Sequence, residues 1–224
     1  MIADWHTYAI EDFIPFTADT YVRLIEFLNE DIWPLHLVTF LIGVAILALF
    51  GKQHHRWPGA LLGVVWIWVG YAFHMERYSS LVWAGDYFGW AFIAQGVFLI
   101  LCGACGILRI SRYDWPEWLG AALAVFALTV YPLLIVLSGR GWSGSEWFGI
   151  APDPTAVYTL GVILLAARGA WLVLLLPIPL LWCAVSGATL WALEMPPALL
   201  LPVIAAIGLA VALAKAIRKT GNRG

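Results

Sequence analysis

The chain has 224 residues, of which 62% are hydrophobic and only 12% charged, and its mean hydropathy is +0.87. A soluble domain carries about twice that share of charge, so water is excluded as the main solvent of the fold and we expect a lipid bilayer instead. The formal net charge of -2 and the fourteen tryptophans, a residue that favours the membrane boundary, argue against nucleic acid as a partner.

Residues 1–31 are predicted to form a segment on the outer side of the membrane. They begin with an acidic stretch that lacks the basic start and short apolar core of a cleaved signal peptide, so the first span is expected to insert uncleaved. Asp19 is placed to cap a helix over residues 20–31. One side of that helix carries Val22, Ile25 and Leu28, and the other carries Arg23, Glu26 and Glu30. This pattern predicts an amphipathic helix lying on the membrane.

Seven apolar runs separated by glycine, proline and charged residues follow, over residues 32–217. A spanning helix needs about 20 largely apolar residues. The runs cover residues 32–50, 57–74, 87–108, 118–137, 155–167, 170–193 and 197–217. Only Arg168 and Gly169 separate the short fifth run from the sixth, so these two are either separate crossings or one bent or re-entrant hairpin. We predict an all-α polytopic transmembrane bundle of about seven spans, with a basic cytoplasmic tail at residues 218–224.

The charged residues sort onto alternating connections between the predicted spans. Nine of the twelve lysines and arginines lie on one side, at Lys52, Arg56, Arg109, Arg112, Arg168, Lys215, Arg218, Lys219 and Arg223. Twelve of the fourteen acids lie on the other, at Asp4, Glu11, Asp12, Asp19, Glu26, Glu30, Asp31, Glu76, Asp86, Glu146, Asp153 and Glu194. Because cytoplasmic connections are rich in lysine and arginine, the first side is predicted to be cytoplasmic. The N-terminus is then periplasmic and the C-terminus cytoplasmic.

Two histidines are predicted to lie at one depth on neighbouring antiparallel helices. His36 is near the outer start of the first span and His74 near the outer end of the second. Imidazoles so placed are able to ligate haem iron, or to bind a divalent metal together with Glu76 or Asp31. In the alternative, both histidines form hydrogen bonds within helix interfaces and Glu76 pairs with its neighbour at a helix end. The remaining polar members of this stretch are Arg77 and Tyr78.

Glu194 ends the sixth span on the outer side, at a depth close to that of Tyr131 and Gln95. Its apolar and proline neighbours are expected to desolvate it partly, which suits a proton carrier or a cation ligand. The alternative is an exposed acid in a tight outer turn. Pro177 and Pro179 are expected to bend the same span and free backbone carbonyls, as in the ion sites of transporters or in a simple packing kink.

Three further stretches have both a functional and a structural interpretation. The outer loop at residues 138–155 either folds over the acidic face as a lid or anchors at the membrane interface. Cys102 and Cys105 have CxxC spacing, but they lie in an apolar run beside small residues such as Gly103, a pattern typical of close helix packing. The basic stretch 52–57 is either a site for metal or acidic lipid or only the charged connection that the topology requires.

Motifs of several enzyme classes are missing from the sequence. It has no phosphate-binding glycine loop, no serine hydrolase elbow and no HExxH pattern. No charged residue lies near the middle of a predicted span, which argues against an aqueous pathway. All five histidines precede residue 75, which excludes a site built from histidines on late helices. We therefore favour a function other than catalysis, with a membrane enzyme that uses Glu76 or His74 as base as the weaker alternative.

Several segments resemble a known family. They are Trp5, Tyr8, Asp12, Phe13, Tyr21, the stretch 72–78, Tyr131, Pro132 and the stretch 148–155. Together they resemble a bacterial multispan membrane family that is defined only as a domain of unknown function. The resemblance covers most of the chain and implies a protein of the bacterial inner membrane, but it implies no activity.

The first functional hypothesis is an accessory or structural subunit of a membrane protein complex. Its acidic, aromatic periplasmic face docks other membrane or periplasmic protein subunits, and a haem or metal is held near His36 and His74. The alternative is a transporter of a small solute or cation, with Glu194 and Glu76 at an acidic periplasmic mouth.

Overall fold

The computed structural model describes residues 14–52, 54–111, 113–196 and 198–221, with side chains as far as residue 217. Over these ranges the fold is all-α, as predicted, and contains no strand. Some sequence-based expectations fall outside the described residues: those for Asp4, Trp5, Tyr8, Glu11, Asp12, Phe13, Arg112 and most of the basic tail.

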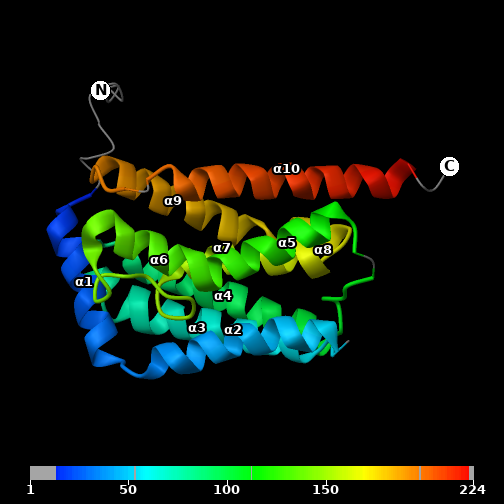
Figure 1. Cartoon of the computed structure of the whole chain (residues 1–224), viewed down its shortest axis with the longest axis horizontal. Coiled ribbons are helices and arrows are strands. Elements are labelled where there is room, and N and C mark those ends of the chain that lie inside the picture. Colours follow the sequence, from blue (N-terminus) through cyan, green and yellow to red (C-terminus); the bar gives the residue numbers. More distant parts are fainter. Residues whose placement is uncertain (1–13, 53, 112, 197, 222–224) are drawn as a thin grey trace, which may run out of the picture.

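The helices form one bundle in which the long elements run side by side (Figure 1). They are α1 (Ala18–Asp31), α2 (Leu35–Gly51), α3 (Trp57–Val69), α4 (Gly85–Ala104), α5 (Trp115–Val125), α6 (Tyr131–Ile135), α7 (Pro152–Ala166), α8 (Ala170–Leu175), α9 (Pro177–Ala192) and α10 (Leu200–Gly221). Three π-helical turns, η3 (Gly70–Met75), η5 (Phe126–Val130) and η6 (Val136–Arg140), continue α3, α5 and α6, and a short 3-10 turn η4 covers Tyr78–Ser80.

Each of the seven predicted runs contains a helix, but the helices differ in length. Within the described part of the chain, five segments are long and apolar enough to cross a membrane: Trp57–Ser80, Gly85–Ala104, Trp115–Arg140, Ala170–Ala192 and Leu200–Ile217. The pair α1 and α2 qualifies together as a sixth, bent by 89° between its helices, and α7 is shorter. Several helices are thus able to span a bilayer.

Helix α1 lies across one end of the bundle, almost at a right angle to α2 (Figure 1). Ile25 and Leu28 on its apolar side are buried against the bundle. The expectation that Asp19 caps this helix is wrong. The helix begins earlier, and the Thr17 side chain caps it by accepting a hydrogen bond from the Thr20 amide at 3.3 Å. Asp19 instead lies in the first turn, where its charge is favourable to the helix dipole.

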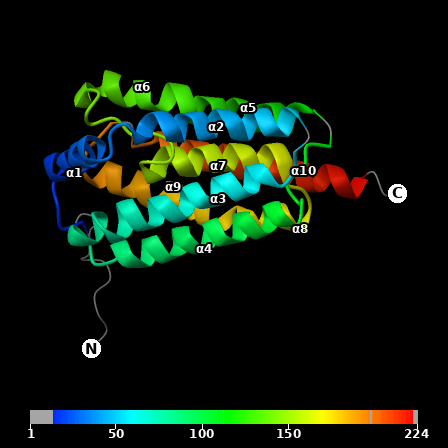
Figure 2. The ribbon, with the colours of Figure 1, turned by 90° about the horizontal axis from the view of Figure 1, so that it is seen from below.

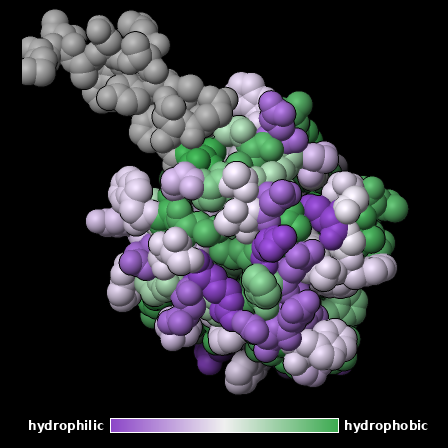
Figure 3. Space-filling model, turned by 90° about the vertical axis from the view of Figure 1, so that its left-hand side faces the viewer, coloured by the Kyte–Doolittle hydropathy of each residue, from purple (hydrophilic) through white to green (hydrophobic). Residues whose placement is uncertain are grey.

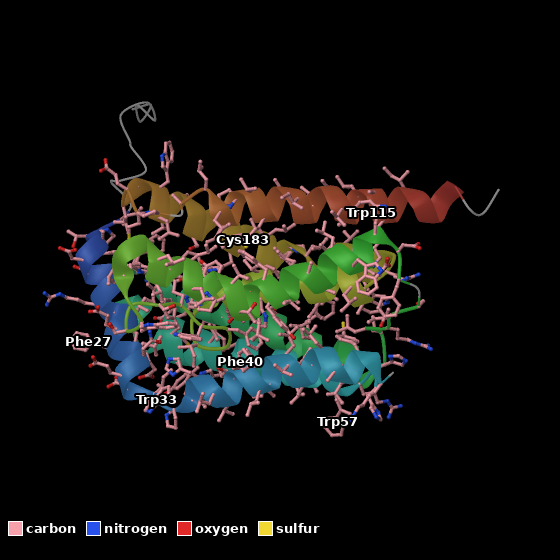
Figure 4. All side chains as sticks on the ribbon, in the orientation of Figure 1. Phe27, Trp33, Phe40, Trp57, Trp115 and Cys183 are labelled. Atoms are coloured by element: carbon pink, nitrogen blue, oxygen red, sulfur yellow. The ribbon has the colours of Figure 1, made fainter. Side chains whose placement is uncertain are left out.

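The two ends of the bundle carry different ionic groups. At the end with α1, the Arg77 guanidinium is 3.2 Å from the Asp31 carboxylate. At the opposite end, Lys215 lies 3.1 Å from Glu117. The labelled side chains follow the same division, with Trp33 at the first end and Trp115 at the second (Figure 4). We name the first the α1 end and the second the α10 end.

Helix α7 occupies the centre of the bundle, and all 15 of its residues are buried. It contacts α5, α9, α10 and α3, and Figure 2 shows it enclosed by the other helices. It is joined to α8 through Gly169, whose φ of 61° is in the left-handed region that favours glycine. The fifth and sixth runs therefore form separate helices.

Glycines allow the central helices to approach closely. A side chain at Gly161 of α7 would lie 2.6 Å from the Gly120 carbonyl of α5, and one at Gly120 would lie 2.6 Å from the Gly161 carbonyl. Gly59 of α3 and Gly103 of α4 face each other in the same way. The packing interpretation is thereby confirmed for Gly103, beside Cys102, whereas a side chain at Gly106 would meet nothing within 4 Å.

We expect Gly161→Ala to destabilise the protein by about 1–3 kcal/mol, because the added methyl group forces α5 and α7 apart. Thermal unfolding in detergent, followed by size-exclusion chromatography, measures this. Gly51→Ala is the matched control, since a side chain there meets nothing within 4 Å. Equal melting temperatures for the two variants would contradict this account of the packing.

Candidate functional site

The α1 end of the bundle presents a hydrophilic face. Figure 3 looks onto this end and shows polar side chains across its centre with apolar ones around them. Glu30 and Asp31 at the end of α1 are exposed. This end carries both the predicted acidic surface and, beneath it, a set of buried polar residues.

The loop between η6 and α7 folds inward and covers these buried residues. Asn29 of α1 holds it in place, because its amide nitrogen donates hydrogen bonds to the carbonyls of Ser143 and Ser145, at 2.6 and 2.8 Å. The Ser145 hydroxyl donates to the Pro132 carbonyl at 2.8 Å. Residues 144–146 and 148–151 are buried. The loop thus packs inward over buried polar residues while Trp142 stays 61% exposed, so the lid and the interfacial anchor both stay predictions.

Asp153, in the first turn of α7, is fully buried and accepts hydrogen bonds from several side chains. The Trp182 indole donates to Oδ1 at 2.8 Å, and the Ser186 hydroxyl donates to Oδ2 at 2.8 Å. Both donors come from α9. The carboxyl group thus links the central helix to its neighbour through hydrogen bonds that compensate part of the cost of its burial.

Glu146, carried inward by the loop, is the second buried acid of this cluster. Its Oε1 atom forms an ion pair of 2.7 Å with Arg140, and the two side chains are 1% and 7% exposed. The Tyr131 hydroxyl lies between the acids, 3.5 Å from Glu146 Oε2 and 3.4 Å from Asp153 Oδ2. The carboxyl groups of Asp153 and Glu146 thus both contact this one hydroxyl. We call these four residues and the two α9 donors, Trp182 and Ser186, the acid-pair cluster.

The charges of the acid-pair cluster do not balance if both acids are ionised. Arg140 provides one positive charge, and the Tyr21 ring covers it at 5.7 Å from the guanidinium carbon. Two carboxylates would leave one buried negative charge, which is costly in a low dielectric. The Tyr131 hydroxyl has a single hydrogen and can donate it to only one of the two acids at a time. The arrangement is therefore chemically suited to hold one proton.

His74, a predicted cofactor ligand, lies beside this cluster in an aromatic enclosure. It is fully buried, and its ring centroid is 4.7 Å from that of Trp182 and 4.4 Å from that of Phe92. Neither ring nitrogen has a hydrogen-bond partner within the described structure. An imidazole in such surroundings is uncharged, because an unpaired buried charge is too costly. Tyr78 packs edge-on against the same imidazole.

His36 has different neighbours. Its Nε2 atom is 2.9 Å from Asn29 Oδ1, and its ring contacts Trp33 and Trp147. Asp31 is engaged by Arg77, and Glu76 is exposed. Among the residues that the structure describes, no three His, Cys, Asp or Glu side chains are grouped to hold a metal ion. The structure thus gives the two histidines separate surroundings, and a haem or metal between them stays a prediction.

The other predicted residues divide between the interior and the surface. Tyr131 joins the acid-pair cluster. Glu194 is exposed rather than partly desolvated, and it lies at a left-handed turn with φ of 54° beside an open crevice of about 920 Å³. Gln95 is buried, and its amide nitrogen donates to the Leu175 carbonyl at 3.1 Å. In an α-helix that carbonyl would pair with the amide of residue 179, which is a proline, so Gln95 compensates the predicted helix break.

Sequence reasoning did not single out the two acids, Arg140 or the α9 donors. A signal was present for Asp153, which stands between two prolines directly before an apolar run too short to cross a bilayer. Because a run this short must be surrounded by other helices, an acid at its start is expected to be buried as well. Glu146 carries no such signal, since its burial depends on how the loop folds.

A second ionic cluster lies at the α10 end. It contains two cations and one acid, whereas the acid-pair cluster contains one cation and two acids. Glu117 accepts hydrogen bonds from Arg168 at 3.0 Å and pairs with Lys215 at 3.1 Å. The Lys215 ammonium also donates to the Leu164 carbonyl at 2.6 Å, near the end of α7. Here two cations surround one carboxylate, and Lys215 also contacts the end of the central helix, as expected of a structural clamp.

Comparison with known proteins assigns the chain to a protein family. A family model described as a family of unknown function, DUF6064, matches residues 18–223. The chain belongs to the DUF6064 family. The matched range includes α1 to α10 and both ionic clusters. No curated protein and no solved structure matches the chain significantly, so the DUF6064 assignment brings no activity with it.

We expect Arg140→Gln to destabilise this DUF6064 protein by about 3–5 kcal/mol, because it leaves two buried carboxyl groups without a cation. The control is Arg77→Gln, which removes the ion pair with the exposed Asp31 and the hydrogen bond to the Ala72 carbonyl at the same end, and it is expected to cost about 1 kcal/mol. Thermal unfolding of both variants in the same detergent measures the difference. If Arg140→Gln unfolds at the wild-type temperature, the ion pair does not hold the loop.

Proposed function

We propose that the chain is an integral protein of the bacterial inner membrane, with the α1 end in the periplasm and the α10 end in the cytosol. The sorting of acids and cations onto alternate connections supports this orientation. The other six helical runs then cross the membrane as lipid-facing spans, while α7, too short to do so on its own, passes through the middle of the bundle and is shielded from lipid by the others. Helix α1, at 89° to α2, lies along the outer surface.

Within that membrane the chain acts as a non-catalytic accessory subunit that docks another membrane subunit at its outer end. The observation that carries this proposal is a groove of about 510 Å³ at the junction of α1, α2 and the inward-folded loop. Its lining is strongly aromatic. The residues around it are Asn29, Glu30, Trp33, His36, Leu37, Phe40, Trp142, Ser143 and Trp147.

The composition of this groove suits a protein partner. Trp33 and Trp142 are 65% and 61% exposed, and large aromatic side chains are the residues that contribute most to protein interfaces. Glu30 and Asp31 beside them supply a charged rim. The groove begins where the polar outer end meets the apolar flank of α2, so a transmembrane helix with a basic outer end fits it.

We expect a photo-crosslinking amino acid at position 40 to yield one discrete adduct with a second membrane protein in native membranes. Phe40 lines the groove and is 37% exposed. The control position is 203 on α10, where Val203 is 52% exposed on another helix. Electrophoresis and mass spectrometry of the adducts provide the readout.

The same experiment distinguishes a partner from lipid. A protein adduct at position 40 that is missing at position 203, and that Trp33→Ala weakens, supports the docking function. Lipid adducts at both positions, with no protein adduct at position 40, would sink it.

A second candidate function, proton handling, is favoured by the acid-pair cluster. It revises the cation-transporter hypothesis, because the buried carboxyl groups at the α1 end are Glu146 and Asp153 whereas Glu194 and Glu76 are exposed. The cluster lies near the outer end and is covered by the loop that Asn29 holds. A proton shared by two acids in that position can be exchanged with the outer side when the loop opens.

We expect Asp153→Asn to remove the infrared absorption of a protonated carboxyl group seen at neutral pH in the wild type. Asp31→Asn, which changes an exposed acid at the same end, leaves that absorption unchanged. Because Arg140 pairs with Glu146, the proton is expected on Asp153, and the neutral amide of Asp153→Asn is then expected to keep stability within about 1 kcal/mol of wild type. A wild-type spectrum without the band, or stability that depends on sodium or potassium instead of pH, would show that the cluster holds a metal cation or both charges.

A further inference from the structure

A concave basic pocket lies at the α10 end, between two connections that are far apart in the sequence. Its volume is about 450 Å³, and it is lined by His54, His55, Arg56 and Trp57 from the start of α3 and by Cys105, Gly106 and Arg109 after α4. Gly106 has φ of 65°, a conformation that turns the chain after α4. Close packing of α3 on α4 through Gly59 and Gly103 holds the two walls together.

The charges in this pocket have no acidic partner among the described residues. Across those ranges, neither Arg56 nor Arg109 forms an ion pair, and no acid lines the pocket. The nearby acid Glu117 is already occupied by Arg168 and Lys215. Two uncompensated guanidinium groups facing one cavity attract an anion.

A further feature points to a phosphate group. Helix α3 starts here without a side-chain cap, so the amides of its first turn, apart from Pro58, which has no N–H, lie at the pocket end of the helix. The two guanidinium groups and this helix start together form a donor set that suits phosphate oxygens.

We propose that this pocket binds a phosphate group, as carried by an anionic phospholipid. Trp57 stands at its edge and is 62% exposed, and an indole so placed is typical of the depth at which lipid head groups lie. Basic pockets between helices on the cytoplasmic side are suited to anionic head groups. The proposal is independent of the docking groove and the acid-pair cluster, which lie at the other end.

A cysteine that lines the pocket can report whether the pocket is occupied. Cys105 is exposed and lines the cavity, whereas Cys102 and Cys183 are buried. The rate at which a maleimide modifies Cys105 in the full-length protein, in neutral detergent, therefore measures whether the pocket is filled. The ligands to add are phosphatidylglycerol, phosphatidylcholine, and inorganic phosphate against chloride at equal ionic strength.

We expect phosphatidylglycerol to slow modification of Cys105, and Arg56→Gln or Arg109→Gln each to raise the lipid concentration needed about fivefold. Lys52→Gln, which removes a cation at the same end outside the pocket, is the control and leaves that concentration unchanged. Protection by phosphatidylglycerol alone identifies a lipid head group, and protection by inorganic phosphate as well identifies a free phosphate site. Equal protection by phosphatidylcholine, no protection at all, or an equal effect of Lys52→Gln would overturn the proposal.

Discussion

The structure depends on the enclosure of one short helix. Helix α7 has 15 residues, all buried, and at about 1.5 Å per residue it is shorter than the hydrocarbon core of a bilayer. Its backbone ends would therefore be exposed to lipid if it stood alone. In the protein, other residues form hydrogen bonds with these backbone groups. At the C-terminal end, the Lys215 ammonium donates to the Leu164 carbonyl and the Arg109 amide donates to the Ala166 carbonyl. The other helices are arranged around this constraint.

The two ionic clusters at the ends of α7 differ in their charge balance. At the α10 end, two cations meet one acid and the carbonyls at the negative end of the helix dipole, so both charge and geometry favour a permanent clamp. At the α1 end, two acids meet one cation beside a buried helix start. The acid-pair cluster is neutral only when one acid carries a proton, and the loop held by Asn29 and the Tyr21 ring of α1 cover it. Of the two, the α1 end is the one whose charge can change without unfolding the helix.

The sequence predicted the elements well because bilayer-length hydropathy is a local property. Each predicted run contains a helix, and the proline break near Pro179 was placed correctly. The acid-pair cluster was not found, because Glu146 and Asp153 were only assigned to the outer side with the other acids. Their burial follows from contacts between distant segments, such as Asn29 with the loop and Trp182 with Asp153, and no local pattern encodes such contacts. The π-helical turns were likewise not predicted.

Length also explains why the short run was the hardest to interpret. The requirement for about 20 apolar residues applies to a helix that faces lipid, since only then must apolar side chains cover the whole hydrocarbon thickness. A helix surrounded by other helices is free of that requirement, and polar residues are tolerated at its start as long as neighbouring side chains form hydrogen bonds with them. Asp153 inside an otherwise apolar run is then a consequence of enclosure. In a polytopic chain, a run too short to span but bounded by prolines and an acid indicates a central helix, and the acid at its start indicates where the buried polar cluster lies.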